Sequence, residues 1–249
     1  MGLLHDAENS LFDRWQKDLC QRNSGEACHF VTDGVVNEDD AVCGFDSVHP
    51  RLFFVLKDTN GGTFFDLRRT IAEGNYQGER GTWWPIANMM AKIDGIKGEL
   101  KNSPECKAKY FQRTGIMNLK KEPGGGKTNP TKLKRFVREN HHYLFEQISL
   151  YAKKPTIFAC GGTFDLFKKI LQMNDVRFEE NSGMICFCEG CVAFGMWHPA
   201  YYRVSLERRI NAFAEKFGKA STLVKTYGPL CPTAASRTSE RNDCHSPAR

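Results

Sequence analysis

Three polar side chains stand where apolar runs of the sequence end. Asp58 follows the run 51–56 by two residues, Asn118 follows 115–117, and His198 follows 191–197. In a parallel sheet the carboxyl ends of the strands meet at one edge, and ligands bind there. A carboxylate, an amide and an imidazole would then share a cleft suited to electrostatic or acid–base catalysis. Each residue alone is more often a turn or cap residue, so the prediction depends on all three.

The elements that must position these residues alternate along the chain. Four apolar runs predict strands at 51–56, 115–117, 156–160 and 191–197. Amphipathic segments between and after them predict helices that begin at Pro130, after the cap Thr163 and after the cap Ser205. The apolar face of the first runs from Leu133 to Ile148. This alternation predicts an α/β fold of three layers, α/β/α, around a central, mostly parallel four-stranded sheet.

Length and charge constrain the organisation of the chain. Its 249 residues, 41% of them hydrophobic, fit one domain over 1–227, with a polar, disordered tail over 228–249. Residues 1–50 hold 10 Asp/Glu and 3 Lys/Arg, and we expect this acidic N-terminal extension to pack on the domain. Within it, residues 10–20 predict a helix with Ser10 as N-cap and an apolar face that includes Trp15.

Composition also bears on partners and compartment. Residues 101–139 hold 11 Lys/Arg and 3 Asp/Glu, which suits a nucleic-acid backbone, although a solvated helix face has the same composition. No segment reads as a membrane span or a signal peptide. A chain of this size needs no disulfide bonds, so its ten cysteines favour a reducing compartment. We expect a cytoplasmic monomer with no membrane partner.

In their order and places, these motifs resemble those of the uracil-DNA glycosylase superfamily. In that family a first strand ends in a Gly-Gln-Asp-Pro-Tyr type loop, a second in an Asn that reads the base, and a late strand in His-Pro-Ser before a loop that wedges into the duplex. Here 56–60 (Leu-Lys-Asp-Thr-Asn), Asn118 and 198–200 (His-Pro-Ala) stand in those places. The resemblance spans roughly residues 50–215, and each motif is short and imperfect.

The resemblance implies a monofunctional DNA glycosylase that hydrolyses the bond between a flipped pyrimidine and its sugar and leaves an abasic site. Asp58 would stabilise positive charge on the sugar and orient a water, and His198 would donate a hydrogen bond to the departing base. Asn118 would pair with the Watson–Crick edge of the base. We expect no cofactor and no metal, and the partner that the resemblance implies is DNA, double- or single-stranded.

Further contacts to the base and to DNA follow from the same resemblance. An aromatic ring should stack on the base, and the candidates are Phe64, Phe65, Trp83 and Trp84. Tyr201 or Tyr202 would fill the gap that the flipped base leaves. The side chains expected to contact phosphates are Lys57, Lys120, Lys121, Lys127 and Arg203.

The sequence departs from the family pattern where the family excludes thymine. The Pro-Tyr of the family is replaced by Thr59-Asn60, so Asn60 and Gly61 would form a lower wall beside position 5 of the base. We therefore expect a C5-modified base such as hydroxymethylcytosine, glucosylated or not, and a role in phage defence. The alternatives are a uracil-DNA glycosylase in base-excision repair and a catalytically silent DNA-binding member.

Two other motifs favour different chemistry less well. The stretch 124–128 (Gly-Gly-Gly-Lys-Thr) resembles a phosphate-binding P-loop, but Lys121 stands where that pattern requires its first Gly. Cys186, Cys188 and Cys191 are close enough in sequence for an iron–sulfur or zinc site. Members of the superfamily that carry an iron–sulfur cluster usually have a Cys-x-x-Cys near the N-terminus, which this chain lacks. The favoured interpretation is therefore a hairpin with buried cysteines.

Overall fold

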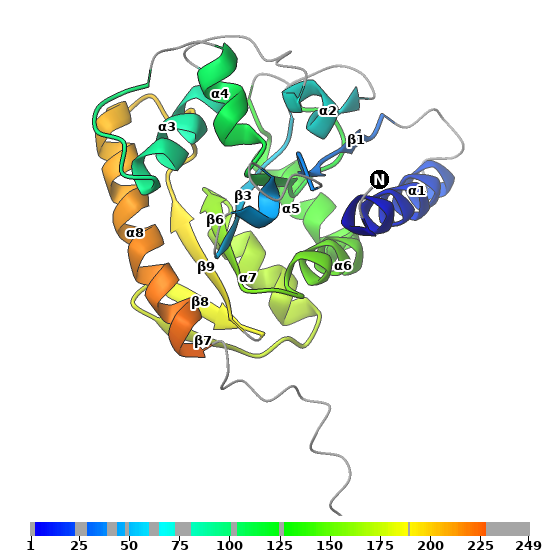
Figure 1. Ribbon diagram of the computed structural model, residues 1–249. Helices are drawn as coiled ribbons and strands as arrows, with labels where there is room; N and C mark the ends of the chain where they lie inside the picture. The colour runs from blue at the N-terminus through cyan, green and yellow to red at the C-terminus, as the bar shows by residue number, and fades with distance from the viewer. Residues whose placement is uncertain are drawn as a thin grey trace, which may run out of the picture.

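Seven strands form one sheet in the computed structural model, which describes residues 3–22, 29–38, 44–47, 50–59, 65–72, 81–100, 104–124, 127–188 and 190–227 (Figure 1). In the order in which they lie side by side, the strands are β2 (Gly34–Val35), β5 (Gly115–Asn118), β3 (Arg51–Leu56), β6 (Thr156–Gly161), β9 (Cys191–Met196), β8 (Met184–Phe187) and β7 (Phe178–Asn181).

The predicted α/β class is confirmed, but the predicted size and direction of the sheet are wrong. The four predicted strands are β5, β3, β6 and β9, and each pairs in parallel with its neighbours in this set. β2 pairs antiparallel with β5 at one edge, and β8 and β7 continue antiparallel beyond β9 at the other. β2 has only two residues and β7 is largely exposed, so neither has the apolar run of a central strand.

Helices cover both faces of the sheet (Figure 1). Side chains of β3 alternate between the faces, with Phe54 in one apolar cluster and Phe53 in the other. The Phe54 cluster includes α3 (Trp83–Ile93), α4 (Pro104–Phe111) and α8 (Leu206–Tyr227). The Phe53 cluster includes α1 (Leu3–Arg22), α5 (Pro130–Glu139), α6 (His141–Tyr151) and α7 (Phe164–Met173). The central parallel strands are therefore buried on both sides, which explains their continuous apolar runs.

The three predicted helix starts are confirmed, since α5 begins at Pro130, α7 at Phe164 after Thr163, and α8 at Leu206 after Ser205. Asn129 caps α5 by accepting hydrogen bonds from the N–H groups of Thr131 and Lys132, and Pro130 fills the first turn, where its missing N–H costs nothing. The hydroxyl of Ser205 accepts from the N–H of Arg208 at the start of α8. The apolar face that was expected to be continuous is divided between α5 and α6.

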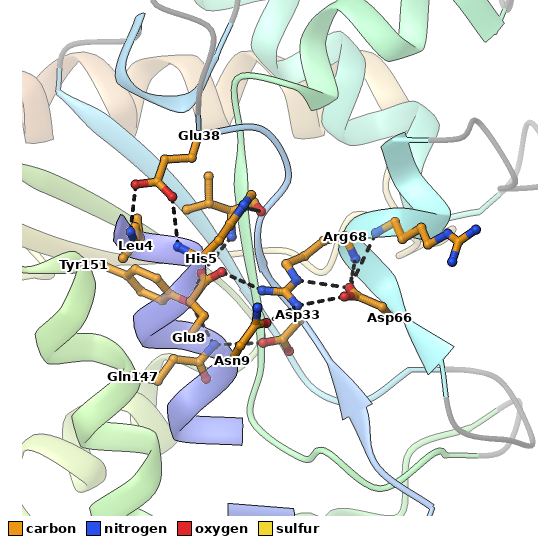
Figure 2. Close-up of polar contacts among 12 residues, drawn as sticks. Leu4, His5, Glu8, Asn9, Asp33, Glu38, Asp66, Arg68, Gln147 and Tyr151 are labelled. Carbon is orange, nitrogen blue, oxygen red and sulfur yellow. Dashed lines mark hydrogen bonds and ion pairs between the residues drawn. The ribbon is translucent and has the colours of Figure 1, made fainter. Parts of the chain in front are cut away.

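Two predicted caps are wrong. Ser10 lies inside α1, which begins at Leu3; the carboxylate of Glu38 instead accepts hydrogen bonds from the N–H groups of Leu4 and His5, at 2.8 Å each (Figure 2). Thr163 stands before α7, but its hydroxyl donates to the carbonyl of Val55 and makes no capping bond. Glu38 and Val55 are both distant in sequence from the helix starts that they affect, so local patterns could not reveal these contacts.

The described part of the acidic N-terminal segment packs into the molecule. The predicted apolar face of α1 is confirmed, since Leu11, Phe12, Trp15 and Leu19 are buried and α1 lies against α6. β1 (Val31–Thr32) pairs in parallel with β4 (Phe65–Asp66) in a second, two-stranded sheet, and α2 (Leu67–Ala72) follows β4. Among the described residues, no helix is both long enough and apolar enough to cross a membrane.

The cysteine predictions meet with a mixed outcome. Cys186 and Cys191 are buried on the hairpin of β8 and β9, as predicted, whereas Cys188 is exposed in its turn. Cys20 is disulfide-bonded, contrary to the expectation that the chain forms no disulfides. The tail predicted over 228–249 lies outside the described residues.

Candidate active site

The three candidate catalytic residues lie at the carboxyl ends of parallel strands along one edge of the sheet. Asn118 is the last residue of β5 and pairs with Leu56, the last residue of β3, so Asp58 follows beside it. His198 follows β9, with β6 between it and β3. Three strand spacings separate the ends of β5 and β9, about 14 Å. The edge between them is formed by Lys57 and Asp58 after β3, by Gly161 at the end of β6 and by Gly162 after it.

Asp58 is held by the loop that precedes α5. The hydroxyl of Thr128 donates to Asp58 Oδ1 at 2.5 Å. Gly124 lies against the other oxygen: a Cβ at this position would stand 2.4 Å from Asp58 Oδ2. The N–H of Gly124 also donates to the carbonyl of Thr59, at 2.7 Å. The stretch that resembled a P-loop therefore contacts the candidate catalytic carboxylate, which fixes the orientation of that group.

Asn118 presents a hydrogen-bond donor that the described residues do not use. Its side chain is 2% exposed, and Nδ2 is buried without a hydrogen-bond partner in the described part of the chain. An unsatisfied buried amide costs free energy unless a ligand satisfies it. Its backbone N–H donates to Asp33 Oδ2 at 2.7 Å, so Asp33 fixes the backbone that carries the amide.

His198 is a neutral imidazole at physiological pH. Burial, together with the positive charges of Lys57 and Arg209, lowers the pKa of His198 to about 4. The N–H of Ala200 donates to His198 Nδ1 at 3.2 Å, so Nδ1 is an acceptor and the neutral ring carries its proton on Nε2. Gly161, which ends β6, lets the residue after His198 pack closely, since a Cβ on Gly161 would stand 3.2 Å from the Cδ of Pro199. The site therefore contains an uncharged N–H donor.

The loop after His198 exposes the side chains that were predicted to enter DNA. Tyr202 is 85% exposed, and Tyr201 and Arg203 are exposed beside it. Lys127 is exposed at the start of the segment before α5, and Lys57 is half-buried near His198. These side chains are therefore accessible to a ligand from solution.

Three predicted contacts are wrong because the side chains are committed elsewhere. Lys121 is fully buried, and its Nζ donates to Asp33 Oδ1 and Oδ2 at 2.6 and 2.7 Å. Lys120 is nearly buried and donates to the carbonyls of Glu122 and Pro123. Trp84 is buried in the core, and its indole N–H donates to Glu99. None of the three can reach DNA without a rearrangement.

A buried polar network that the sequence did not reveal contacts the backbone of Asn118 through Asp33. Glu8 of α1 accepts from the N–H of Val35, the hydroxyl of Tyr151 and the guanidinium of Arg68 (Figure 2). Arg68 also contacts Asp66, and Gln147 donates to Asp33. Burial raises the pKa of Glu8 and lowers that of Lys121. No local pattern in the sequence indicates this network, because its members come from distant stretches of the chain.

Other parts of the predicted site are outside the description. Asn60, Gly61 and Phe64 lie outside the described residues, and the side chain of Phe65 is not described. Trp83 is half-buried, edge-on to Phe111. Within the described ranges, no cluster of His, Cys, Asp or Glu side chains could hold a metal ion.

Comparison with known proteins adds no family assignment. No protein-family model matches the chain, and no curated protein matches its sequence. What the site can do must therefore be argued from its own geometry.

Proposed function

We propose that this protein is a monofunctional DNA glycosylase that hydrolyses the N-glycosidic bond of a flipped pyrimidine. The observation that carries the proposal is the arrangement of Asp58, Asn118 and His198 at the carboxyl ends of β3, β5 and β9. Each has the chemical form that the reaction needs: an oriented carboxylate, an unsatisfied amide donor and a neutral N–H donor. The resemblance of their motifs to those of the uracil-DNA glycosylase superfamily supports the same reaction.

In the proposed reaction, water replaces the base at C1′ of the deoxyribose. As the bond to the base breaks, positive charge develops on the sugar and the carboxylate of Asp58 stabilises it. The base leaves with the bonding electrons as an anion, His198 Nε2–H donates a hydrogen bond to its carbonyl oxygen, and the released base takes up a proton from solvent. Asp58 orients the water whose oxygen bonds to C1′, and the proton that this water loses passes to the carboxylate and then to solvent. Fixed groups of this kind supply much of the rate in such reactions.

The proposed base is a pyrimidine modified at C5, such as hydroxymethylcytosine or its glucosylated form. This part of the proposal rests on the sequence, where Thr59-Asn60-Gly61 replaces the bulkier wall of uracil enzymes. Asn118 can serve either cytosine or uracil, because its amide offers both a donor and an acceptor. Uracil release in base-excision repair is the nearest alternative.

Base release from defined DNA tests the proposal. The wild type, Asp58→Asn and a matched control, Asp13→Asn, would be incubated with DNA that carries uracil, hydroxymethylcytosine, glucosylated hydroxymethylcytosine or cytosine. Alkali then cleaves the abasic sites, and the products are separated on a gel. Asp13 is exposed on α1 and is not one of the candidate site residues.

We expect cleavage at one modified base, a loss of about 10²–10³-fold in Asp58→Asn, and no change in Asp13→Asn. Brisk release of uracil with none of the C5-modified bases would reject the proposed substrate and keep the enzyme class. Wild-type protein that binds these DNAs but releases no base would identify a silent DNA-binding protein instead.

A further inference from the structure

A pocket of about 760 Å³ lies beside the candidate active site, at the carboxyl ends of β6 and β9. Its walls come from the starts of α5 and α7, from Trp197 and from the first half of α8. Neither Asp58, Asn118 nor His198 lines it, and nothing in the proposed reaction uses it. The pocket therefore needs an explanation of its own.

The charged residues that line the pocket are mostly cations. They are Lys57, Lys134, Arg209 and Lys216, against the single acid Asp165, which is exposed at the first turn of α7. Lys216 donates to the carbonyl of Gly195 through Nζ, at 2.5 Å. The balance of charge around this space favours an anion.

Arg209 is the residue that identifies the ligand class. It is 9% exposed, its Nε donates to the carbonyl of Val204 at 3.1 Å, and its Nη1 is buried without a hydrogen-bond partner among the described residues. Burial lowers the pKa of Arg209, with no carboxylate acting against that effect. A buried guanidinium without a counter-ion is costly, and the groups that match its planar donors best are carboxylates and phosphates.

The start of α7 points to phosphate. α7 begins at the wall of the pocket, which Thr163 and Phe164 line, whereas the first N–H groups of α5 already donate to the side chain of Asn129. The side chain of Thr163 does not cap α7, because its hydroxyl donates to Val55. N–H groups of a first helical turn that no side chain caps favour anions, and phosphate most often.

We propose that this pocket binds a phosphate group through Arg209, with Lys57, Lys134 and Lys216 around it. The phosphate belongs either to a DNA strand that passes the active site or to a free nucleotide. Lys57 and Arg209 both act electrostatically on His198, so the pocket adjoins the candidate site and a strand bound there can reach it. The proposal goes beyond the glycosylase proposal and does not depend on it.

The test compares Arg209→Gln with a control, Arg208→Gln. Arg208 is exposed and does not line the pocket, although its guanidinium lies over the ring of Trp197 in the pocket wall. Inorganic phosphate and deoxycytidine monophosphate would be titrated by calorimetry, with sodium chloride at equal ionic strength as the blank. Binding of unmodified single-stranded DNA would be measured by fluorescence anisotropy over a range of salt concentrations. Thermal unfolding of each variant would be followed with and without phosphate.

For a free nucleotide, we expect the wild type and Arg208→Gln to bind the monophosphate and Arg209→Gln to lose about tenfold or more in affinity, the range typical of a buried charge-assisted contact. Phosphate would raise the unfolding temperature of the wild type and not of Arg209→Gln. For a DNA phosphate, the small probes would not bind, and Arg209→Gln would reduce the salt dependence of DNA binding by about one ion.

Arg209→Gln should fold, because it removes an uncompensated buried charge, and its unfolding temperature without ligand reports whether it does. If a folded Arg209→Gln binds monophosphate and DNA as well as the wild type, the proposal is overturned. If the wild type binds neither the monophosphate nor DNA, the proposal is overturned as well. Arg209-dependent binding by a protein that releases no base would leave this proposal standing and reject the glycosylase.

Discussion

At the scale of single residues, the site combines groups whose protonation states suit bond cleavage without a strong acid. The imidazole of His198 is kept neutral by burial and by the cations Lys57 and Arg209. Its Nδ1 accepts a backbone hydrogen bond, which leaves Nε2–H to donate. A neutral donor stabilises a leaving base without the cost of burying an imidazolium beside two cations.

The titration of His198 is therefore expected near pH 4 instead of near its ordinary value of 6.5. Nitrogen NMR of the histidine rings should find the His198 proton on Nε2 at pH 6. Between pH 6.5 and 4 the unfolded chain binds the proton more readily, so the free energy of unfolding falls as the pH falls. The slope is at most about 1.4 kcal/mol per pH unit. Urea denaturation should show this loss of stability in the wild type and not in His198→Gln. A His198 titration with its midpoint near pH 6.5 in the NMR spectra would contradict the prediction.

At the scale of elements, the loop between β5 and α5 orients the carboxylate. Lys120 donates to the carbonyls of Glu122 and Pro123, Gly124 lies against Asp58, and Thr128 donates to it before α5 begins. The helix start at Asn129 and Pro130 fixes the far end of the loop. Asp58 follows β3, so the loop that orients its carboxylate comes from the neighbouring strand, β5.

Gly124→Ala should reduce activity more than stability. The added Cβ would stand 2.4 Å from Asp58 Oδ2 and 2.7 Å from its Cγ, so the carboxylate must move. We expect a loss of base release of about 10²-fold, as a displacement of about 1 Å produces in a positioned group. Gly218→Ala is the control: Gly218 is exposed on α8 with open space around it, and alanine there should stabilise the helix by up to about 1 kcal/mol. Equal base release by the wild type and Gly124→Ala would show that Asp58 needs no such fit.

At the scale of the whole molecule, buried charges join the N-terminal segment to the sheet. Glu8, Arg68, Asp33 and Lys121 come from four separate stretches of the chain. Glu8 pairs with Arg68 and Asp33 pairs with Lys121, and Tyr151 and Gln147 link the two pairs. Figure 2 shows Glu8, Arg68 and Asp33 with these two linking residues. Gly34 permits the closest approach, since its φ is +133° and a Cβ there would collide with Glu8. The network also reaches the site, because Asp33 accepts from the N–H of Asn118.

Lys121→Met should destabilise the protein strongly. It leaves Asp33 buried without its cation, and removing one partner of a buried ion pair costs about 3–5 kcal/mol. Urea denaturation of Lys121→Met, Asp33→Asn and the double variant would measure the coupling, and the double variant should recover part of the loss. A cost below about 1 kcal/mol for Lys121→Met would mean that the pair contributes little.

Much of the framework was readable because it depends on local pattern. The four central strands are continuous apolar runs, since strands covered on both faces need apolar side chains throughout. The capping of α5 by Asn129 with Pro130, and the cap of α8 by Ser205, follow from short-range chemistry. The order of the strand ends was then enough to predict that Asp58, Asn118 and His198 share one edge.

Only the tertiary structure decided which polar side chains are available at that edge. Lys121 and Lys127 look equivalent in a basic segment, yet one is buried against Asp33 and the other is exposed. Arg208 and Arg209 are adjacent, yet Arg208 is exposed, whereas Arg209 is buried with its Nη1 unpaired among the described residues. Sequence patterns report periodicity and local propensity, whereas the cost of a charge depends on which distant groups surround it after folding. Spacing along the chain thus determined the edge that carries the candidate site, and long-range packing determined the charges, donors and pocket found there.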